Sequence, residues 1–360
     1  MNQKIDKHTT TSIKILAIDT SCDETSVAVT QNTTVLSNIV ASQVNLHKPY
    51  GGVYPTIAKQ AHKEKINLVI QQALKRASID KSKLDAIAVT VGPGLAPALE
   101  VGIQTAERIA KEWNKPLIAV NHIEGHVLSV LAKPNSKKRK KEMQTKFPVL
   151  SVVVSGGHTE FILIEKIGKY RILGQTIDDA AGECLDKVGR MINLGYPAGP
   201  VIEKIAKLGN PIKFKFPLPM TTTKNFNLSY SGIKTFSKRL INDLEKKKQL
   251  KKQTIFDLCA SLQTGIFRHI IYKLNKLLIE HPVNAIWLGG GVANNTTLRK
   301  TLRQSLKQKK LKLTVPYTKK LCSDNAAMIG IAAYYKHQRN EFQNSTKKID
   351  RAPQWKIDEL

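Results

Sequence analysis

The sequence is short of acidic residues, of cysteine and of long apolar runs. Its 360 residues include 28 Asp and Glu against 57 Lys and Arg, a formal charge of +29. The four cysteines are widely spaced, with no C-x-x-C pair, so neither a disulfide framework nor a zinc ribbon is indicated. No apolar run approaches the ~18 residues of a membrane span, and the first dozen residues resemble neither a signal nor a transit peptide. We therefore expect a soluble, cytoplasmic protein.

The composition is that of a folded chain with an unusual set of basic residues. Apolar residues make up 41% and charged residues 24%, which is typical of globular proteins, and the length favours about two domains. Lysines number 46 and arginines only 11. This excess is consistent with A+T-rich codon usage, because nucleic-acid-binding surfaces favour the bidentate guanidinium of arginine. The total charge still predicts attraction to polyanions.

Apolar strand patterns alternate with helical ones along the chain, and the opening pattern occurs twice. Strands at 13–18 and 26–30 flank a polar turn, and about 135 residues later strands at 148–154 and 161–164 flank the turn SGGHTE. Further expected elements are helices at 55–76, 98–113, 232–248 and 254–280, and strands at 85–91, 116–120 and 285–290. The alternation indicates an α/β fold, and the repeat indicates two duplicated lobes with a ligand cleft between them.

Breaks in composition suggest where the lobes begin and end. We expect a first α/β lobe at 1–132, a linker or exposed basic loop at 133–147, a second α/β lobe at 148–322, a C-terminal helix at 323–341 that packs back toward the first lobe, and a loose polar tail at 342–360.

The segment His122-Ile123-Glu124-Gly125-His126 is a candidate metal site. Histidines at i and i+4 share one face of a helix and can bind one ion, although ordinary surface or core histidines show the same spacing. Glu124 lies roughly 200° around the helix from either histidine, so the H-E-x-x-H arrangement of zinc proteases is absent. Asp324, where a loop enters the last helix, is a candidate third ligand; its alternative role is the N-cap of that helix.

Two glycine-rich turns and one acidic segment are candidate nucleotide contacts. Ser155-Gly156-Gly157-His158-Thr159 lies between two expected strands, and Gly289–Asn295 runs from a strand into a helix, where backbone amides can bind an anion. The acidic segment Asp178–Asp186 opens another helix. Its charge suits the helix dipole and equally a contact with a ribose or a metal.

Ten blocks in order give these motifs a common context. They are LAIDTSCDETSVAV (16–29), GGVYPTIAKQAH (51–62), GPGLAPALEVG (92–102), VNHIEGH (120–126), VVSGGHTE (153–160), TIDDAAGECLDKV (176–188), LGYPAGP (194–200), SYSGIKT (229–235), GGGVANN (289–295) and CSDNAAMIG (322–330). Together they resemble the TsaD family of tRNA N6-adenosine threonylcarbamoyltransferases, which belongs to the actin/Hsp70/sugar-kinase superfamily. The resemblance implies a duplicated two-lobe, actin-like (RNase H-like) fold.

The resemblance also implies a set of site residues. It implies a metal, iron(II) or alternatively zinc(II), held by His122, His126 and Asp324. It implies a threonylcarbamoyl-adenylate site formed by Val153, Val154, Ser155, Gly156, Gly157, Asp186, Gly199 and Asn295. Asp23 and Glu24 are the acids available for proton handling or for positioning tRNA. Val153 stands where archaeal-type relatives have a metal-approaching tyrosine, so that ligand is absent.

The implied activity is a metal-dependent transfer to tRNA. The threonylcarbamoyl group would pass from L-threonylcarbamoyl-adenylate to the N6 amine of adenosine 37, next to the anticodon of tRNAs reading ANN codons, with release of AMP. A paralogous non-catalytic subunit and a small P-loop ATPase are the implied partners, and no membrane is involved. The alternatives are an ATP-dependent binding scaffold of the actin/Hsp70 superfamily, a metalloprotease and a small-substrate kinase.

Overall fold

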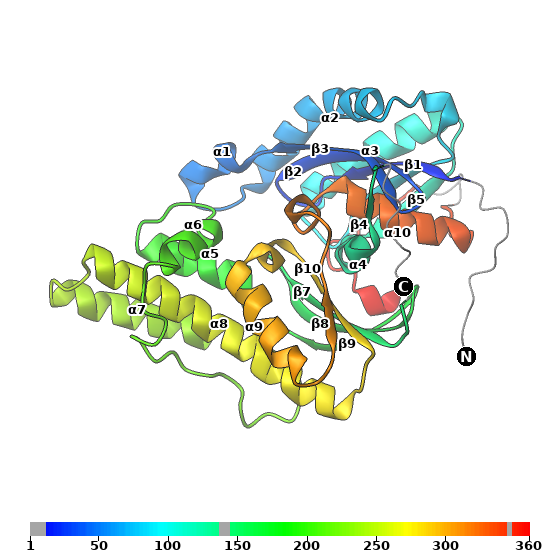
Figure 1. Ribbon diagram of the computed structural model, residues 1–360. Helices are drawn as coiled ribbons and strands as arrows, with labels where there is room; N and C mark the ends of the chain where they lie inside the picture. The colour runs from blue at the N-terminus through cyan, green and yellow to red at the C-terminus, as the bar shows by residue number, and fades with distance from the viewer. Residues whose placement is uncertain (1–11, 137–144, 344–347) are drawn as a thin grey trace.

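Two β-sheets with the same strand order form the framework of the molecule (Figure 1). The computed structural model describes residues 12–136, 145–343 and 348–360. Within these residues the first sheet has the order β5-β4-β1-β2-β3-β6 and the second has the order β11-β10-β7-β8-β9. In both sheets the central hairpin (β1–β2 or β7–β8) is antiparallel, and the strand on its other side (β4 or β10) runs parallel. The duplication expected from the sequence is therefore confirmed.

The strands have the following bounds. In the first sheet they are β1 (Lys14–Asp19), β2 (Glu24–Gln31), β3 (Thr34–Ser42), β4 (Ala86–Gly92), β5 (Leu117–Asn121) and β6 (Lys133–Pro134). In the second they are β7 (Val149–Val154), β8 (Thr159–Lys166), β9 (Lys169–Gln175), β10 (Ala285–Gly289) and β11 (Lys312–Thr314). All residues of β4 and of β7 are buried, as expected for central strands covered on both faces.

Helices cover both faces of the first sheet. On one face lie α2 (Pro55–Ala77) and α3 (Ala96–Glu112), with the four-residue α1 (Val44–His47) before them. On the other face lies α10 (Ala326–Gln338), from the far end of the chain, which packs against β1, β2 and the short helix α4 (His122–Leu128). A C-terminal helix thus completes the lobe built by the N-terminal strands.

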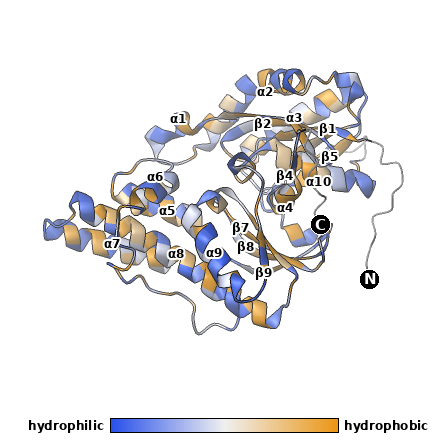
Figure 2. Ribbon diagram, in the orientation of Figure 1, coloured by the Kyte–Doolittle hydropathy of each residue, from blue (hydrophilic) through white to orange (hydrophobic). Residues whose placement is uncertain are grey.

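The helices of the second lobe bury a separate apolar core. They are α5 (Ala181–Met191), α6 (Gly199–Ala206), α7 (Ser231–Lys246), α8 (Lys252–Glu280) and α9 (Thr296–Lys307). Figure 2 shows hydrophobic and hydrophilic residues alternating along α7 and α8, the pattern of amphipathic helices with one buried face. None of the helices in the described ranges is both long and apolar enough to span a bilayer.

The structure differs from the sequence-based expectation at the edges of the lobes. Residues 133–134 do not leave the first lobe but form β6, which pairs with β3 at the edge of its sheet. Residues 137–144, most of the expected basic loop, lie outside the described residues. Strands β3 and β9 were not predicted, because their apolar residues alternate with polar ones less regularly than in the neighbouring strands.

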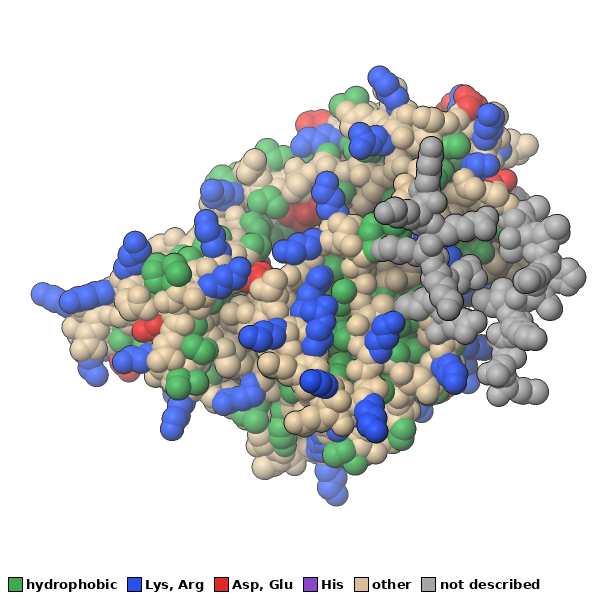
Figure 3. Space-filling view, viewed as in Figure 1, with side chains coloured by type: hydrophobic (Ala, Val, Ile, Leu, Met, Phe, Trp, Pro, Cys, Tyr) green, Lys and Arg blue, Asp and Glu red, His purple; other side chains and the backbone are tan. Residues whose placement is uncertain are grey.

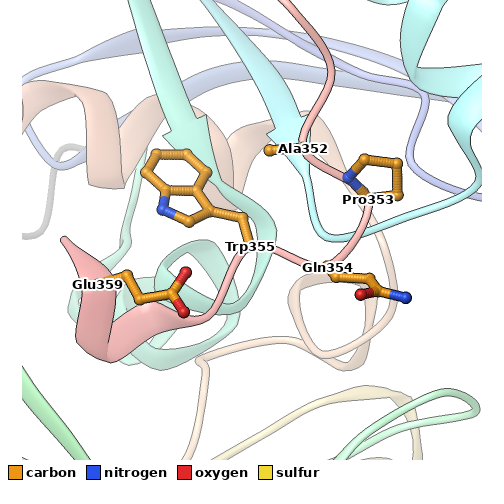
Figure 4. A pocket seen from close by; sticks show the side chains of 5 residues that line it. All are labelled: Ala352, Pro353, Gln354, Trp355 and Glu359. Carbon is orange, nitrogen blue, oxygen red and sulfur yellow. The ribbon is translucent and has the colours of Figure 1, made fainter.

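The expectation of a loose tail is wrong for residues 348–360. The amide of Ala352 donates to the carbonyl of Val91 (2.7 Å), and Ile357 is only 1% exposed. The sequence did not indicate this packing, because the apolar side chains of residues 348–360 are separated by polar ones and follow neither a helical nor a strand period. A surface depression of about 470 Å³ is lined by Ala352, Pro353, Gln354, Trp355 and Glu359 (Figure 4).

Candidate active site

The two histidines lie on a short helix at the junction of the lobes. Helix α4 begins at His122, and the Asn121 side chain caps it by accepting from the amides of Ile123 (2.8 Å) and Glu124 (3.2 Å). The helix packs against α10 of the first lobe and against β7 and β10 of the second. His122 and His126 are 5% and 0% exposed, and their ring centroids lie 4.7 Å apart. The same helix face therefore presents both imidazoles to one buried point.

Asp324 meets both imidazoles at that point. Its Oδ1 lies 3.1 Å from Nε2 of His126 and 3.5 Å from Nε2 of His122. The cap of α10 is the neighbouring Asn325, whose side chain accepts from the amide of Met328. Asp324 is therefore not the N-cap that the sequence left open, and its carboxylate is directed toward the histidines.

A second carboxylate, from Asp19 at the end of β1, also faces His122. Its Oδ2 lies 3.7 Å from Nδ1 of His122. Burial alone would lower the pKa of His122, but the charges of Asp324 and Asp19 outweigh it and raise that pKa to about 10. Burial dominates at His126 and lowers its pKa. The carboxylates thus favour positive charge beside His122, whether it comes from a proton or from a bound cation.

The donor set fits a single transition-metal ion. The candidate ligand atoms of His122, His126 and Asp324 all lie within 4.8 Å of one another. Ligand atoms about 2.1 Å from one ion at tetrahedral or octahedral angles would be separated by about 3.0–3.4 Å, close to the two Oδ1–Nε2 distances above. Two imidazoles and one carboxylate suit iron(II) or zinc(II) and leave coordination positions open for a substrate.

Glu124 lies on the same helix but has other partners. Its Oε1 accepts from the Tyr170 hydroxyl (2.9 Å) and lies 3.8 Å from Arg339. Burial raises the pKa of Glu124, and the nearby Lys336 opposes that effect. A carboxylate held by these groups cannot act as the general base of a metalloprotease at the histidines.

The turn between β1 and β2 brings Asp23 and Glu24 near the candidate metal site. Burial raises the pKa of Glu24 well above its usual value, and the charges of Asp23 and Asp324 raise it further. Burial raises the pKa of Asp186 on α5, and the negative charge of Asp23 raises that pKa further. The acidic turn of the first lobe therefore faces both Asp324 and the second lobe.

A buried hydrogen-bond network around His62 holds this acidic turn in place. Nε2 of His62 lies 3.0 Å from the carbonyl of Cys22, so Nε2 carries the proton and donates it. Nδ1 of His62 then accepts from the Thr25 hydroxyl (2.8 Å) and from the Gln43 amide (3.2 Å). Burial lowers the pKa of His62, which keeps the ring neutral and in this tautomer. The turn is therefore held by a defined set of donors and acceptors.

The turn between β7 and β8 exposes its backbone at two glycines. Gly156 and Gly157 are exposed, and a Cβ added at either would meet no atom within 4 Å. Behind them, a Cβ at Gly182 of α5 would lie 2.5 Å from the Ser155 carbonyl, so α5 packs closely under the turn. The preceding Val153 and Val154 are fully buried in β7, so the structure exposes neither of these two predicted contacts to a ligand. This arrangement suits close approach of an anionic group.

The remaining predicted ligand contacts already have partners within the chain. Oδ1 of Asp186 accepts from the amides of Ala198 (2.8 Å) and Gly199 (2.9 Å), which brings two predicted residues together at the start of α6. The Asn295 side chain caps α9 and donates to Oε1 of Gln263 (2.8 Å). Both residues fix helix starts, and a ligand contact would add to that role.

The sequence did not single out Asp19 or His62, and it named His158 only as part of a glycine-rich turn. Burial, together with the charges of His122 and His126, lowers the pKa of His158 to about 4, so this residue of the second-lobe turn lies near the histidine pair. A signal existed for Asp19, since it directly follows a buried strand. For His62 there was none, because its partners lie 37, 19 and 40 residues away.

Comparison with known structures places the fold among two-lobed, actin-like α/β proteins. Full-length HypF in its phosphate- and nucleotide-bound form matches with a TM-score of 0.59, covering 92% of this chain and 56% of that one at 13% identity. The activator of the 2-hydroxyisocaproyl-CoA dehydratase from Clostridium difficile, with bound ADPNP, matches with a TM-score of 0.52, covering 92% and 99% at 13% identity. These identities establish the fold alone.

Sequence relatives give the particular family. The model of the family described as "TsaD: tRNA N6-adenosine threonylcarbamoyltransferase" matches residues 34–331. Proteins of that name from Dictyoglomus turgidum and Clostridium kluyveri are each 42% identical, over 90% of this chain and 93% of the first relative, and over 96% and 98% for the second. The chain belongs to the TsaD family.

Proposed function

We propose that this chain transfers the threonylcarbamoyl group of L-threonylcarbamoyl-adenylate to the N6 amine of adenosine 37 in tRNAs that read ANN codons, with release of AMP. The observation that carries the proposal is the convergence of His122, His126 and Asp324 at the junction of the lobes, beside the acidic turn of the first lobe. Membership of the family supplies the reaction class.

The adenylate would bind to the second lobe. The exposed backbone at Gly156 and Gly157 allows its phosphate to approach closely, and Oδ2 of Asp186 is the oxygen left to accept from a ribose hydroxyl, since both amide contacts use Oδ1. Bound between the lobes, iron(II), or alternatively zinc(II), would act as a Lewis acid at His122, His126 and Asp324.

The acidic turn of the first lobe would handle the proton. The N6 nitrogen forms a bond to the carbamoyl carbon, the bond from that carbon to the phosphate oxygen breaks, and AMP leaves with the electron pair. Glu24 or Asp23 accepts the proton that the N6 nitrogen loses. The raised pKa of Glu24 makes its carboxylate a stronger base than an exposed one.

The surface charge suits a tRNA substrate. Figure 3 shows Lys and Arg side chains spread over the face in view, with few acids among them. Helix α9 has four basic residues and no acidic one: Arg299, Lys300, Arg303 and Lys307. Such a surface binds phosphate backbones with an affinity that falls as salt rises, so these side chains would contribute to tRNA binding rather than to the chemical step. We place the protein in the cytoplasm, where tRNA is modified.

Nucleoside analysis of cellular tRNA tests the proposal with any partner subunits in place. In cells depleted of this chain, mass spectrometry should show loss of threonylcarbamoyladenosine, and a wild-type copy should restore it. A His126→Ala copy should not, whereas His337→Ala, at the remote end of α10, should. Unchanged threonylcarbamoyladenosine in depleted cells would reject the proposal and favour the ATP-dependent scaffold.

A further inference from the structure

Asn121 connects the candidate metal helix to the C-terminus of the chain. It is fully buried, and its Oδ1 accepts from the first free amides of α4, those of Ile123 and Glu124. Its Nδ2 donates to the carbonyl of Trp355, 234 residues further along the chain (3.0 Å). Each end of the amide thus has one kind of partner, and a flipped amide would lose the contacts on both sides.

The segment that supplies this carbonyl, residues 349–359, is here called the C-terminal strap. The amide of Ile349 donates to Oε1 of Glu107 on α3 (2.8 Å), and the carbonyl of Pro353 accepts from the amide of Gly94 (3.2 Å). Figure 4 shows Ala352, Pro353 and Trp355 following one another past the ends of neighbouring strands. The strap ends against the second lobe, where its short 3-10 helix (Ile357–Glu359) packs on β9.

Gly92, at the end of β4, shows how closely the strap is seated. A Cβ built there would lie 1.7 Å from the carbonyl oxygen of Ala352, and the three nearest atoms all belong to Ala352. A side chain at this position would therefore collide with the backbone of the strap. The strap also lies beyond residue 331, where the match to the family model ends.

A helix of seven residues cannot hold its own geometry, because fewer than four turns are marginally stable without external contacts. The direction of the His122 and His126 side chains therefore depends on the contacts that hold α4, and the cap at its start is one of them. We propose that Asn121 is a positioning residue for these two ligands, and that the C-terminal strap sets the orientation of its amide. This inference rests on the metal site of the proposed function.

Cobalt(II) binding, followed by the visible absorption of the bound ion, measures the site without tRNA or adenylate. Asn121→Asp keeps the capping oxygen but replaces the donor with an oxygen that repels the Trp355 carbonyl. Removal of residues 349–360 removes the carbonyl itself. Each change should weaken cobalt affinity about tenfold, as loss of groups that orient metal ligands does. Combined, they should cost no more than either alone, because both break one contact.

Two further variants separate positioning from a general loss of stability. Asp80→Ala removes the side-chain cap of a remote 3-10 helix and should leave cobalt affinity unchanged. Gly92→Ala should weaken cobalt binding in the full chain, since it displaces the strap, and should add nothing in the shortened chain. This comparison holds even where shortening lowers the unfolding temperature.

The outcomes are distinct. Wild-type cobalt affinity in both Asn121→Asp and the shortened chain would overturn the inference, as would additive losses in the double variant. A wild-type chain that binds no cobalt would overturn it together with the metal site. Cobalt binding with the expected losses, in a chain that transfers no threonylcarbamoyl group, would support the inference and reject the proposed function.

Discussion

The turn after β1 and the turn after β7 occupy the same place in the two copies of the fold, yet their chemistry is opposite. The first-lobe turn, between Asp19 and Glu24, brings carboxylates toward Asp324 and is held by the buried His62 network. The second-lobe turn has Gly156 and Gly157 exposed, with α5 packed beneath it. The duplicated fold therefore has two equivalent hairpins whose turns carry different side chains.

Under the proposed function, this difference would assign a different part of the reaction to each lobe. Carboxylates repel a phosphate, so the acidic turn suits proton transfer and not adenylate binding. Exposed glycine backbone cannot take up a proton, but it allows an anion to approach amides closely. Helix α4 contacts elements of both lobes, so the histidine pair lies where the two lobes meet.

The largest effect should come from a change at this histidine pair. His126→Ala removes a proposed metal ligand, and we expect the metal content per chain to fall to background and transfer activity to fall at least about a hundredfold. Elemental analysis of the purified protein measures the first and a tRNA modification assay the second. His337→Ala, a histidine remote from the site, is the matched control. Full metal content in His126→Ala would contradict the assignment.

Substitution of two glycines of the second lobe should destabilise the fold to very different extents. Gly182→Ala places a methyl group against the Ser155 carbonyl and should destabilise the fold by about 1–3 kcal/mol, as overpacking does. Gly156→Ala points into open space and should change the unfolding free energy by less than about 0.5 kcal/mol. Denaturant unfolding measures both. Equal losses would show that the second-lobe turn is packed on both sides and unavailable to a ligand.

Disruption of the His62 network should lower the rate of transfer without changing the binding of the adenylate. His62→Gln loses part of the hydrogen bonding that holds the Cys22 carbonyl and Thr25, so the acidic turn shifts. We expect kcat to fall about tenfold with an unchanged KM for the adenylate, because a small misplacement of a proton acceptor slows only the chemical step. A change in KM alone would mean that the first-lobe turn binds the adenylate.

The second lobe has its own buried neutral histidine, which should make stability depend on pH. Burial, reinforced by Lys273, lowers the pKa of His269 to about 4, below its unfolded value of about 6.5. The unfolded chain therefore binds the extra proton as pH falls from about 6.5 to 4, and stability is lost at about 1.4 kcal/mol per pH unit. Urea unfolding between pH 5 and 6.5 should show a smaller slope for His269→Gln. An identical slope would contradict the pKa shift.

Much of the fold was predictable because its signals are local. The strand–turn–strand repeat revealed the duplication, and the apolar period of residues 55–76 located α2 to within a residue. The strand β6 and the C-terminal strap were missed, since they are held by contacts with distant residues and not by a pattern of their own. The strand β3 was missed although it pairs with the adjacent β2 across a two-residue turn.

The candidate site likewise has residues that the local sequence pattern indicated and residues that only the structure reveals. His122 and His126 were recognisable because four residues along one helix place two side chains on one face. The placement of Asp324 opposite them, 198 residues away, came from resemblance, and only the structure shows that Asn325 takes the capping role. His62 acts through contacts across the fold, which no local pattern records, whereas the place of Asp19 at the end of a buried strand was a usable signal.

The central claim, that the first-lobe turn serves the chemical step and the second-lobe turn binds the adenylate, can be tested in one experiment. Single-turnover transfer to unmodified tRNA, measured over a range of threonylcarbamoyl-adenylate concentrations, separates the rate at saturation from the dissociation constant. Glu24→Gln should lower the rate about a hundredfold and keep the dissociation constant, while Gly156→Ala should raise the dissociation constant about tenfold and keep the rate. If both variants change the same parameter, the division of labour between the two turns is contradicted.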